Sequence, residues 1–330
     1  MSLTTFPLSI VIPAYKPDFL QKALQSIEDQ TDKRFQVFIG DDASSSDLRA
    51  IAQPFLKRNG WEYFRFSKNL GNNNLVQHWN RCVELSSSQW VWLFSDDDKM
   101  SPDCVQTFYA ELEKGHRANV LRFNLQIINE NGDIIDQNLP TPKQVSAFEL
   151  GKLRFTRQLL SSAVEYIFHR DSFEKEGGFV NFPFAWCSDD ASWVAFARDL
   201  PIYTLPSGLV SWRMSKVNIS SRGDFYPKKK IEASIQFINW FNSRFPDQLD
   251  NVFRSEQLIW LRLQMVNLAF QPGFFETLLT LRKLKIPLSV NLLRAFDDLY
   301  CLSYVYWKKV IRNETPSGLR YWLHFILPKY

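Results

Sequence analysis

Three groups of adjacent carboxylates are the residues of this 330-residue sequence best suited to chemistry. They are Asp41-Asp42, Asp96-Asp97-Asp98 and Asp189-Asp190. Neighbouring carboxylates repel one another and raise each other's pKa unless a cation joins them. Such groups therefore indicate a cation site, a proton-transfer site or a solvated turn.

The triplet Asp96-Asp97-Asp98 comes directly after the apolar run Trp90–Phe94. Taken alone, it is equally consistent with a charged turn, in which Ser101 caps a helix that starts at Pro102. The surrounding elements have to decide between a turn and a site.

The first third of the chain alternates short apolar runs with amphipathic segments. Apolar spacing predicts strands at residues 8–12, 36–39, 61–66 and 90–94, with helices between them. This βαβ rhythm indicates a parallel sheet with helices on both faces, and ligands bind such sheets beyond the carboxyl ends of the strands. Pro13-Ala14-Tyr15 and the first two acidic groups follow predicted strands, so we expect them at one edge of the sheet.

The rest of the chain has a different pattern. Strands are predicted at Val120–Ile128 and near residues 163–169, and the chain looks helical after Tyr226, where Leu258, Leu261 and Met265 share one face. The residues from 226 to 330 carry 15 Lys and Arg against 8 Asp and Glu. This basic, aromatic region suits an anionic membrane surface or an acidic partner, and solvated helix faces explain it as simply.

Composition excludes several classes of protein. Hydrophobic residues at 45% and charged residues at 22% describe a globular chain rather than a disordered one. No GxxxxGK[ST] or GxGxxG motif is present, which argues against P-loop and classic dinucleotide-binding proteins. The four scattered cysteines, together with the lack of a secretory signal or a membrane-spanning run, lead us to expect reduced thiols in a cytoplasmic protein.

Several ordered motifs resemble those of family 2 glycosyltransferases. They are SIVIPAYK (9–16), FIGDDAS (38–44), NLGNNN (69–74), HWNRC (78–82), WLFSDDDKMSPD (92–103), GGF (177–179), CSDDASW (187–193) and WRMSKVNIS (212–220). The resemblance covers roughly residues 8–220. It implies the GT-A fold, an α/β, Rossmann-like, mixed and mostly parallel sheet flanked by helices, here with a C-terminal helical extension.

The resemblance also implies a nucleotide site. Its candidate residues are Pro13, Ala14, Tyr15, Asp42, Asn69, Gly71, Asp96 and Arg213. The carboxylate of Asp42 suits the imide N–H of uracil or the amino groups of guanine, although it could instead belong to a helix N-terminal turn. Gly71 is expected to allow a positive φ, and Asn69 either shapes the loop or is an ordinary turn residue.

The same resemblance predicts Mg²⁺ or Mn²⁺ bound by Asp97 and Asp98. Ser95 stands where the family's D-x-D-D pattern usually has its first aspartate, which puts a ribose contact in doubt more than metal binding. Mg²⁺ keeps few protein carboxylates, so one well-placed Asp97 would suffice. Near Arg213, Ser215 replaces a histidine that is frequent in the family, and Lys216 is an alternative partner for phosphate.

Asp190 falls at the position of the family's catalytic base. Phe184, Trp186 and Trp193 are expected to offer a stacking surface for a sugar ring and to desolvate the carboxylate. The competing interpretation is a helix N-cap at Ser188 or Asp189, with acidic residues in the first turn.

We therefore expect a metal-dependent, inverting hexosyltransferase. It would move a sugar from a nucleoside diphosphate, with UDP as the expected nucleotide, to a hydroxyl of a glycan or lipid-linked acceptor, as in bacterial surface polysaccharide synthesis. A non-catalytic nucleotide-sugar-binding subunit and a glycoside hydrolase with paired carboxylates are the alternatives, and no nucleic-acid partner is expected.

The expected domains are a GT-A domain over residues 1–225 and a helical region over residues 226–330. The first divides into a nucleotide-sugar half, about 1–105, and an acceptor half, about 106–225. The second is expected to contact the acceptor, a second copy of the chain or the inner face of a membrane.

Overall fold

A computed structural model describes residues 6–137, 141–216, 218, 226–268 and 282–284. It divides into two compact units, Met1–Ser221 and Arg222–Tyr330. The division of the first unit into a nucleotide-sugar half and an acceptor half stays a prediction.

The elements of the described residues alternate strand and helix in the first third of the chain. The strands are β1 (Leu8–Ala14), β2 (Phe35–Asp41), β3 (Trp61–Arg65), β4 (Trp90–Leu93), β5 (Lys99–Met100), β6 (Val120–Ile128), β7 (Ile134–Gln137), β8 (Gln144–Val145), β9 (Tyr166–His169) and β10 (Ile202–Arg213). The α-helices are α1 (Leu20–Glu28), α2 (Leu48–Ala52), α3 (Gly71–Val83), α4 (Cys104–Leu112), α5 (Ala147–Phe155), α6 (Arg170–Lys175), α7 (Ser188–Ala197), α8 (Pro227–Arg244) and α9 (Asn251–Asn267). Short 3₁₀ helices are η1 (Phe55–Lys57), η2 (Pro183–Ala185) and η3 (Pro246–Gln248).

One mixed sheet organises the first unit. Its main path runs β3-β2-β1-β4-β9-β6-β10-β5, with β7 beside β6 and β8 beside β10. The strands β1 to β4 are parallel to one another, as the apolar runs predict. β9 then lies antiparallel to both β4 and β6, and β10 returns parallel to β6. The expected mixed, mostly parallel sheet is confirmed.

The first strand runs two residues further than its apolar run. Pro13 lies inside β1 and pairs with Gly40 of β2, although it has no N–H to donate. Alternate residues of β1 face opposite neighbours: Ala14 accepts a bond from Asp42, beyond β2, and Val11 accepts one from Phe94, beyond β4. Pro13 shares the β4 side with Val11, and the pairing with β4 has ended by then. Its missing N–H therefore breaks no ladder bond.

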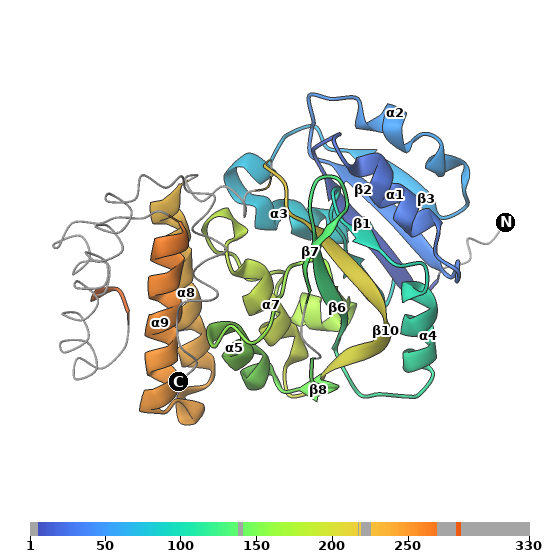
Figure 1. Cartoon of the computed structure of the whole chain (residues 1–330). Helices are drawn as coiled ribbons and strands as arrows, with labels where there is room; N and C mark the ends of the chain where they lie inside the picture. The colour runs from blue at the N-terminus through green and yellow to red at the C-terminus, as the bar shows by residue number, and fades with distance from the viewer. Residues whose placement is uncertain (1–5, 138–140, 217, 219–225, 269–281, 285–330) are drawn as a thin grey trace. The chain divides into compact units, whose positions relative to one another are not determined.

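Helices cover both faces of the sheet (Figure 1). On one face, α1, α2 and α4 bury Leu24, Ala52 and Phe108 against alternate residues of β1 and β2. On the other, α3 packs on β1, β2 and β4, while α6 and α7 pack on β9. The central strands β1, β2 and β4 are accordingly buried along almost their whole length, which is the pattern expected for a sheet covered on both sides.

The helix after the acidic triplet begins at Cys104 rather than at Pro102. Ser101 does not cap it. Its hydroxyl donates to Asp103 at 2.6 Å and accepts the N–H of Leu209 at 2.8 Å. Because Leu209 lies in β10, Ser101 ties the turn after the triplet to that strand.

In the second unit, α8 and α9 pack through aromatic rings. Phe237 lies 6.0 Å from Trp260, and Phe241 lies 6.0 Å from Phe253, measured between ring centroids. None of the helices in the described part of the chain is long and apolar enough to cross a membrane. The remainder of the predicted helical region lies outside the described residues.

Two cysteines of the described residues, Cys82 and Cys104, are free thiols, as expected. Cys82, Cys104 and Cys187 are all buried thiols. Cys301 lies outside the described residues.

Candidate functional site

The carboxyl ends of β1 and β4 are joined by the first carboxylate of the triplet. Asp96 Oδ2 accepts the backbone N–H groups of Tyr15, at 2.8 Å, and of Lys16, at 2.9 Å. Next to them, the N–H of Asp42 donates to the carbonyl of Ala14 at 2.9 Å. The structure therefore brings the three predicted stretches, which follow β1, β2 and β4, to one edge of the sheet.

The second carboxylate of the triplet faces a lysine. Asp97 Oδ1 accepts the hydroxyl of Ser95 at 2.6 Å, as expected for residues two apart in an extended segment. Its Oδ2 lies 3.6 Å from Nζ of Lys16, which also donates to Asn218 Oδ1 at 3.3 Å. Lys16 is thus the cation nearest to Asp97 among the contacts of this site.

The third carboxylate is tied to the end of β10. Asp98 Oδ1 accepts the N–H of Arg213 at 2.6 Å, and Arg213 Nε donates back to the carbonyl of Asp97 at 2.8 Å. The guanidinium of Arg213 also donates to the carbonyls of Asn129 and Glu130. Arg213 is buried and holds the triplet in place, and its predicted contact with the diphosphate stays a prediction.

Burial sets the protonation of these acids. It raises the pKa of Asp96 to about 6, with a further contribution from the charge of Asp97. Burial likewise raises the pKa of Asp98 well above its usual range, and Asp97 again adds to the effect. Asp98 therefore resists ionisation at neutral pH unless further positive charge approaches, whereas Asp96 is mostly ionised there.

The donor set suits a hard divalent cation. It consists of carboxylate oxygens, which Mg²⁺ and Mn²⁺ prefer, and Oδ2 of Asp97 is held by an ion pair alone. Within the described residues, no group of three or more His, Cys, Asp or Glu side chains is already arranged around a metal position. A metal here would accordingly take one or two protein carboxylates and complete its shell with phosphate and water.

The carboxylate of Asp42 is used inside the protein. Its oxygens accept the N–H groups of Leu70, at 2.8 Å, and Gly71, at 2.7 Å, which begin α3. Arg81, from the same helix, pairs with it. His78 lies 3.5 Å away, but burial lowers the pKa of His78 to about 4, so this ring is neutral at pH 7. Base recognition by Asp42 stays a prediction. The alternative places Asp42 in the N-terminal turn of the helix that follows it, but Asp47 caps that helix, α2, and Asp42 instead accepts bonds at the start of α3.

The loop that leads into α3 is closed by the next two predicted residues. Asn69 donates its amide to the carbonyl of Asp42 at 2.9 Å and accepts the N–H of Asn72 at 3.0 Å. The expectation of a positive φ at Gly71 is wrong, since Gly71 is not among the residues with positive φ. A glycine is needed there for a different reason: a Cβ would lie 2.6 Å from Asp42 Oδ2.

The third acidic group, Asp189-Asp190, lies at the start of α7. The chain enters this helix through three non-glycine residues with positive φ, namely Phe184 (58°), Ala185 (55°) and Cys187 (61°). Backbone of this kind is rare outside glycine and is found where the surroundings impose it. The helix starts at Ser188, whose hydroxyl accepts the N–H of Phe182 at 2.9 Å, so the predicted N-cap at Ser188 or Asp189 is wrong.

Asp189 and Asp190 occupy the first turn of α7 and differ in their surroundings. Asp190 is buried, and Arg154 holds both of its oxygens, with Nε at 2.7 Å and Nη2 at 3.0 Å. Asp189 is partly exposed. Burial, together with the charge of Asp190, raises the pKa of Asp189 to about 7, while Arg154 acts in the opposite direction.

One predicted member of the sugar-stacking surface belongs to the core instead. Trp193 is fully buried and stacks on Tyr166 at 4.7 Å between centroids. Its helical position turns it inward, away from solvent. Phe184 and Trp186 are partly exposed, and their contact with a sugar stays a prediction.

Comparison with known families shows the family of this chain. The family description "Glycosyl transferase family 2" matches residues 9–176, which is just over half of the chain. The chain belongs to this family. The matched residues include the acidic triplet.

Individual relatives agree with this family. The chain is 31% identical over 107 residues, 32% of each chain, to an uncharacterized protein of Mycobacterium tuberculosis. It is 22% identical over 176 residues to a GalNAc(5)-diNAcBac-PP-undecaprenol beta-1,3-glucosyltransferase of Campylobacter jejuni, covering 51% of this chain and 55% of that one. The chain thus spans about a third to about half of the length of the curated relatives it matches.

Solved structures confirm the GT-A fold. Residues 1–349 of Staphylococcus aureus TarS, in complex with UDP-GlcNAc, superpose with a TM-score of 0.64 at 12% identity. The match covers 86% of this chain and 82% of TarS 1–349. At that identity, the similarity concerns the fold alone.

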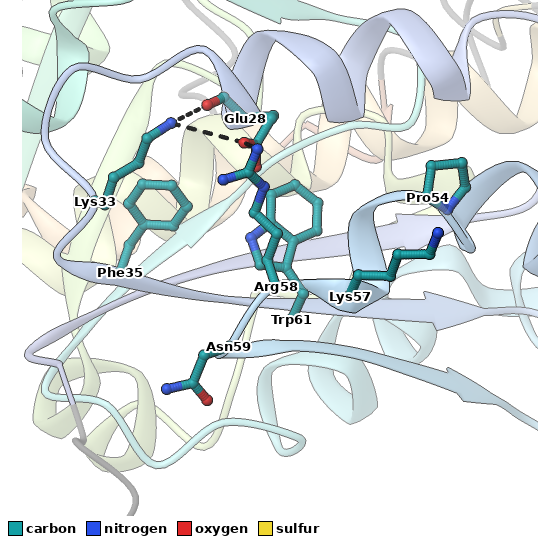
Figure 2. A pocket seen from close by; sticks show the side chains of 8 residues that line it. All are labelled: Glu28, Lys33, Phe35, Pro54, Lys57, Arg58, Asn59 and Trp61. Carbon is teal, nitrogen blue, oxygen red and sulfur yellow. Dashed lines mark hydrogen bonds and ion pairs between the residues drawn. The ribbon is translucent and has the colours of Figure 1, made fainter.

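An open hollow of the first unit is lined by side chains around Glu28 and Trp61 (Figure 2). It has a volume of about 570 Å³ and lies beside the amino ends of β2 and β3. Glu28 pairs there with Lys33 and Arg58. Its lining residues are Glu28, Lys33, Phe35, Pro54, Lys57, Arg58, Asn59 and Trp61, and none of the predicted site residues is among them.

Sequence reasoning assigns no role to two residues of this site. Lys16 ends the motif SIVIPAYK, and Arg154 lies in none of the motifs. Arg154 is 36 residues away from Asp190 in the sequence, and only the packing of α5 against α7 makes them neighbours. Pairings of this kind could have been found only from a three-dimensional arrangement.

Replacing Gly71 by alanine should destabilise the protein by about 1–3 kcal/mol, since the new Cβ must displace the carboxylate of Asp42. Nucleotide binding should weaken as well, because Asp42 is fixed by the N–H groups that begin α3. Chemical denaturation and calorimetric titration with UDP measure the two effects.

Asn72→Ala is the matched control, since Asn72 is exposed one position further along the same helix. It should change the free energy of unfolding by less than about 0.5 kcal/mol. Equal effects of the two substitutions would contradict the close-approach explanation.

Proposed function

We propose that the chain is a metal-dependent, inverting glycosyltransferase that transfers a hexose or related sugar from a nucleoside diphosphate. UDP is the proposed nucleotide, and a hydroxyl of a glycan or lipid-linked molecule is the proposed acceptor. The proposal rests on the position of the acidic triplet, which hydrogen bonds attach to the ends of two strands. Asp96 accepts a bond from the residue after β1, and Asp98 accepts one from the last residue of β10. A role in bacterial surface polysaccharide synthesis is consistent with the C. jejuni relative, whose name describes transfer to an undecaprenol-linked glycan.

The nucleotide would lie over the residues that follow β1 and β2. Pro13, Ala14 and Tyr15 would present backbone and ring to the base and ribose, and the exposed ring of Tyr15 supports this placement. Asn69 and Gly71 would shape the loop beside it. Asp96 contributes by fixing the N–H groups of Tyr15 and Lys16, so its role in nucleotide binding is to hold the β1 loop in place.

Asp97 would hold the metal, with Asp98 as its second protein ligand. When bound, Mg²⁺ or Mn²⁺ supplies positive charge to the departing diphosphate. Lys16 would leave Oδ2 of Asp97 for a phosphate oxygen, since an ammonium group can meet either anion. Arg213 keeps the triplet attached to β10 throughout.

The acceptor would approach from the side of α7. Its hydroxyl oxygen forms a bond to the anomeric carbon as the bond from that carbon to the phosphate oxygen breaks, with inversion of configuration. The proton of the hydroxyl passes to the carboxylate pair at the start of α7, with Asp190 as the proposed catalytic base. Residues 226–330 are proposed to contact the acceptor, a membrane surface or a second copy of the chain.

A calorimetric titration with UDP, with and without Mn²⁺, tests the proposal. We expect binding that strengthens when Mn²⁺ is present, because the metal links the carboxylates to the diphosphate. Hydrolysis of a panel of UDP-sugars in the presence of Mn²⁺ then identifies the donor.

The outcomes separate the alternatives considered from the sequence. Nucleotide binding without turnover, over a wide panel of donors and acceptors, would favour a non-catalytic binding subunit. Failure to bind any nucleoside diphosphate would contradict the proposal. Hydrolysis of a glycoside without any nucleotide requirement would favour a glycoside hydrolase.

A further inference from the structure

The carboxylate proposed as catalytic base has a dedicated partner in another helix. Arg154 of α5 donates through Nε and Nη2 to the two oxygens of Asp190, in the two-pronged geometry that orients a carboxylate most strongly. Its third nitrogen, Nη1, donates to the carbonyl of Leu159 at 2.8 Å. The guanidinium is therefore fixed by the chain on one side and fixes Asp190 on the other.

Hydrogen bonds of Ser192 also fix the position of α7, the helix that carries Asp190. Ser192 accepts the N–H of Val180 at 2.8 Å and donates to the carbonyl of Ser188 at 2.6 Å. Together with the positive-φ residues before it, these bonds set the position of the first turn of α7. The one freedom left to Asp190 is rotation of its side chain, and the contact with Arg154 removes it.

A second ionic pair is buried close enough to Asp189 for their charges to interact. Arg122 of β6 and Glu165, just before β9, are both buried, with Arg122 Nη2 at 3.8 Å from Glu165 Oε1. Arg122 also lies over the ring of Tyr166. Burial raises the pKa of Glu165 to about 8, and the charge of Asp189 adds to this effect.

The charges around the first turn of α7 do not balance when all are ionised. Arg122 and Arg154 supply two positive charges, whereas Glu165, Asp189 and Asp190 supply three negative ones. On its other side, α7 packs Phe196 against Phe173 of α6, an uncharged contact. Because the pKa of Glu165 is about 8, Glu165 holds a proton at neutral pH, and the two arginines then balance the charges of Asp189 and Asp190.

We propose that Arg154 is a positioning residue of the transfer reaction, which orients Asp190 toward the acceptor hydroxyl and keeps the Asp189-Asp190 pair able to accept its proton. The inference rests on the proposed function. It assigns to Arg154 no contact with substrate; the residue acts through Asp190.

The pH dependence gives this role a signature. Adjacent carboxyls titrate as a pair, and the pair must have lost its proton in order to act as a base. Since the charge of Arg154 acts to lower the pKa of Asp189, removing that charge should raise the pKa of Asp189. The acid limb of the pH profile of kcat then moves to higher pH, a change that lost packing alone would not produce.

The test compares Arg154→Gln, Arg154→Lys and Lys152→Gln in the full chain. Lys152 is an exposed cation of the same helix, two residues away, and serves as the control for lost charge. Transfer is measured from pH 5 to 9 with the donor found in the hydrolysis panel, and UDP binding with Mn²⁺ is measured by calorimetry. Thermal unfolding of each variant reports folding.

For Arg154→Gln we expect a loss of about 100-fold in kcat at pH 6, with unchanged affinity for UDP and an acid limb at higher pH. Arg154→Lys should recover part of the rate and restore the acid limb, because it keeps the charge but not the two-pronged contact. Lys152→Gln should behave as the unaltered protein does.

Three results would overturn the inference: an unchanged rate in both Arg154 variants, a lowered rate with an unmoved acid limb, or an equal effect of Lys152→Gln. If Arg154→Gln does not fold, the folded Arg154→Lys variant decides through its rate, which must fall below that of the unaltered chain. Loss of UDP binding by the unaltered chain would instead refute the proposed function, which separates the two failures.

Discussion

Asp190→Asn is expected to lower kcat for sugar transfer by about 10²–10⁴-fold while leaving UDP binding within about twofold. An amide cannot take the proton of the acceptor hydroxyl, but it can still accept a hydrogen bond from Arg154 through its one carbonyl oxygen. The nucleotide site lies at the ends of other strands, so its affinity for UDP should not follow the loss in rate. Steady-state transfer assays and calorimetry measure the two quantities.

The control for this substitution is Asp171→Asn, which removes an exposed carboxylate in the neighbouring α6. It should leave kcat unchanged. Because Asp190→Asn leaves Arg154 with a neutral partner, some loss of stability is expected, and thermal unfolding must show that the variant is folded at the assay temperature. A folded Asp190→Asn enzyme with full activity would rule out Asp190 as the base and would favour Asp189.

The sequence was sufficient for the parallel half of the fold. Buried strands of a parallel sheet are continuous apolar runs, and β1, β2 and β4 each have one. β6 also agrees with its predicted bounds, Val120–Ile128. The meeting of the acidic stretches at one edge followed from the rule that parallel strands present their carboxyl ends together. It required no knowledge of side-chain contacts.

Side-chain partners could not be predicted in the same way. The partners of Asp42 come from the start of α3, nearly thirty residues later, and Trp193 points to the core because α7 packs on β9. The antiparallel insertion of β9 between β4 and β6 is likewise a matter of long-range pairing. Local sequence patterns indicate whether a segment is buried, but they do not indicate which other segment packs against it.

This difference explains the error at Gly71. A glycine in a loop ordinarily suggests a positive φ, which is a local property. Here the constraint is the close approach of Asp42, which follows β2, and a local sequence pattern does not reveal this contact. Lys16 is a similar case, since its role depends on Asp97 and Asn218 from distant parts of the first unit.

Asp97→Asn is expected to weaken the binding of Mn²⁺ in the presence of UDP by at least about tenfold and to lower transfer with it. Among the described residues, Oδ2 of Asp97 contacts only the ammonium group of Lys16, whereas Asp96 and Asp98 each use an oxygen to hold backbone N–H groups. Asp97 is therefore the carboxylate that a metal can reach at the smallest cost in protein contacts. Electron paramagnetic resonance of free Mn²⁺ measures the binding without any assay of activity.

The same substitution should leave the protein without UDP or metal as stable as before, or more stable. Burial is the main cause of the raised pKa of Asp96 and of Asp98, and the charge of Asp97 adds to it, so removing this carboxylate relieves part of the repulsion. Asp18→Asn, which removes an exposed carboxylate close in the sequence to Lys16, should change neither property. If Asp97→Asn bound Mn²⁺ as tightly as the unaltered chain, the metal would have to be held elsewhere. A large loss of stability would show that Asp97 serves the fold rather than the metal. A carboxylate that binds a metal is instead expected to destabilise the protein, through charge repulsion, when no cation is bound.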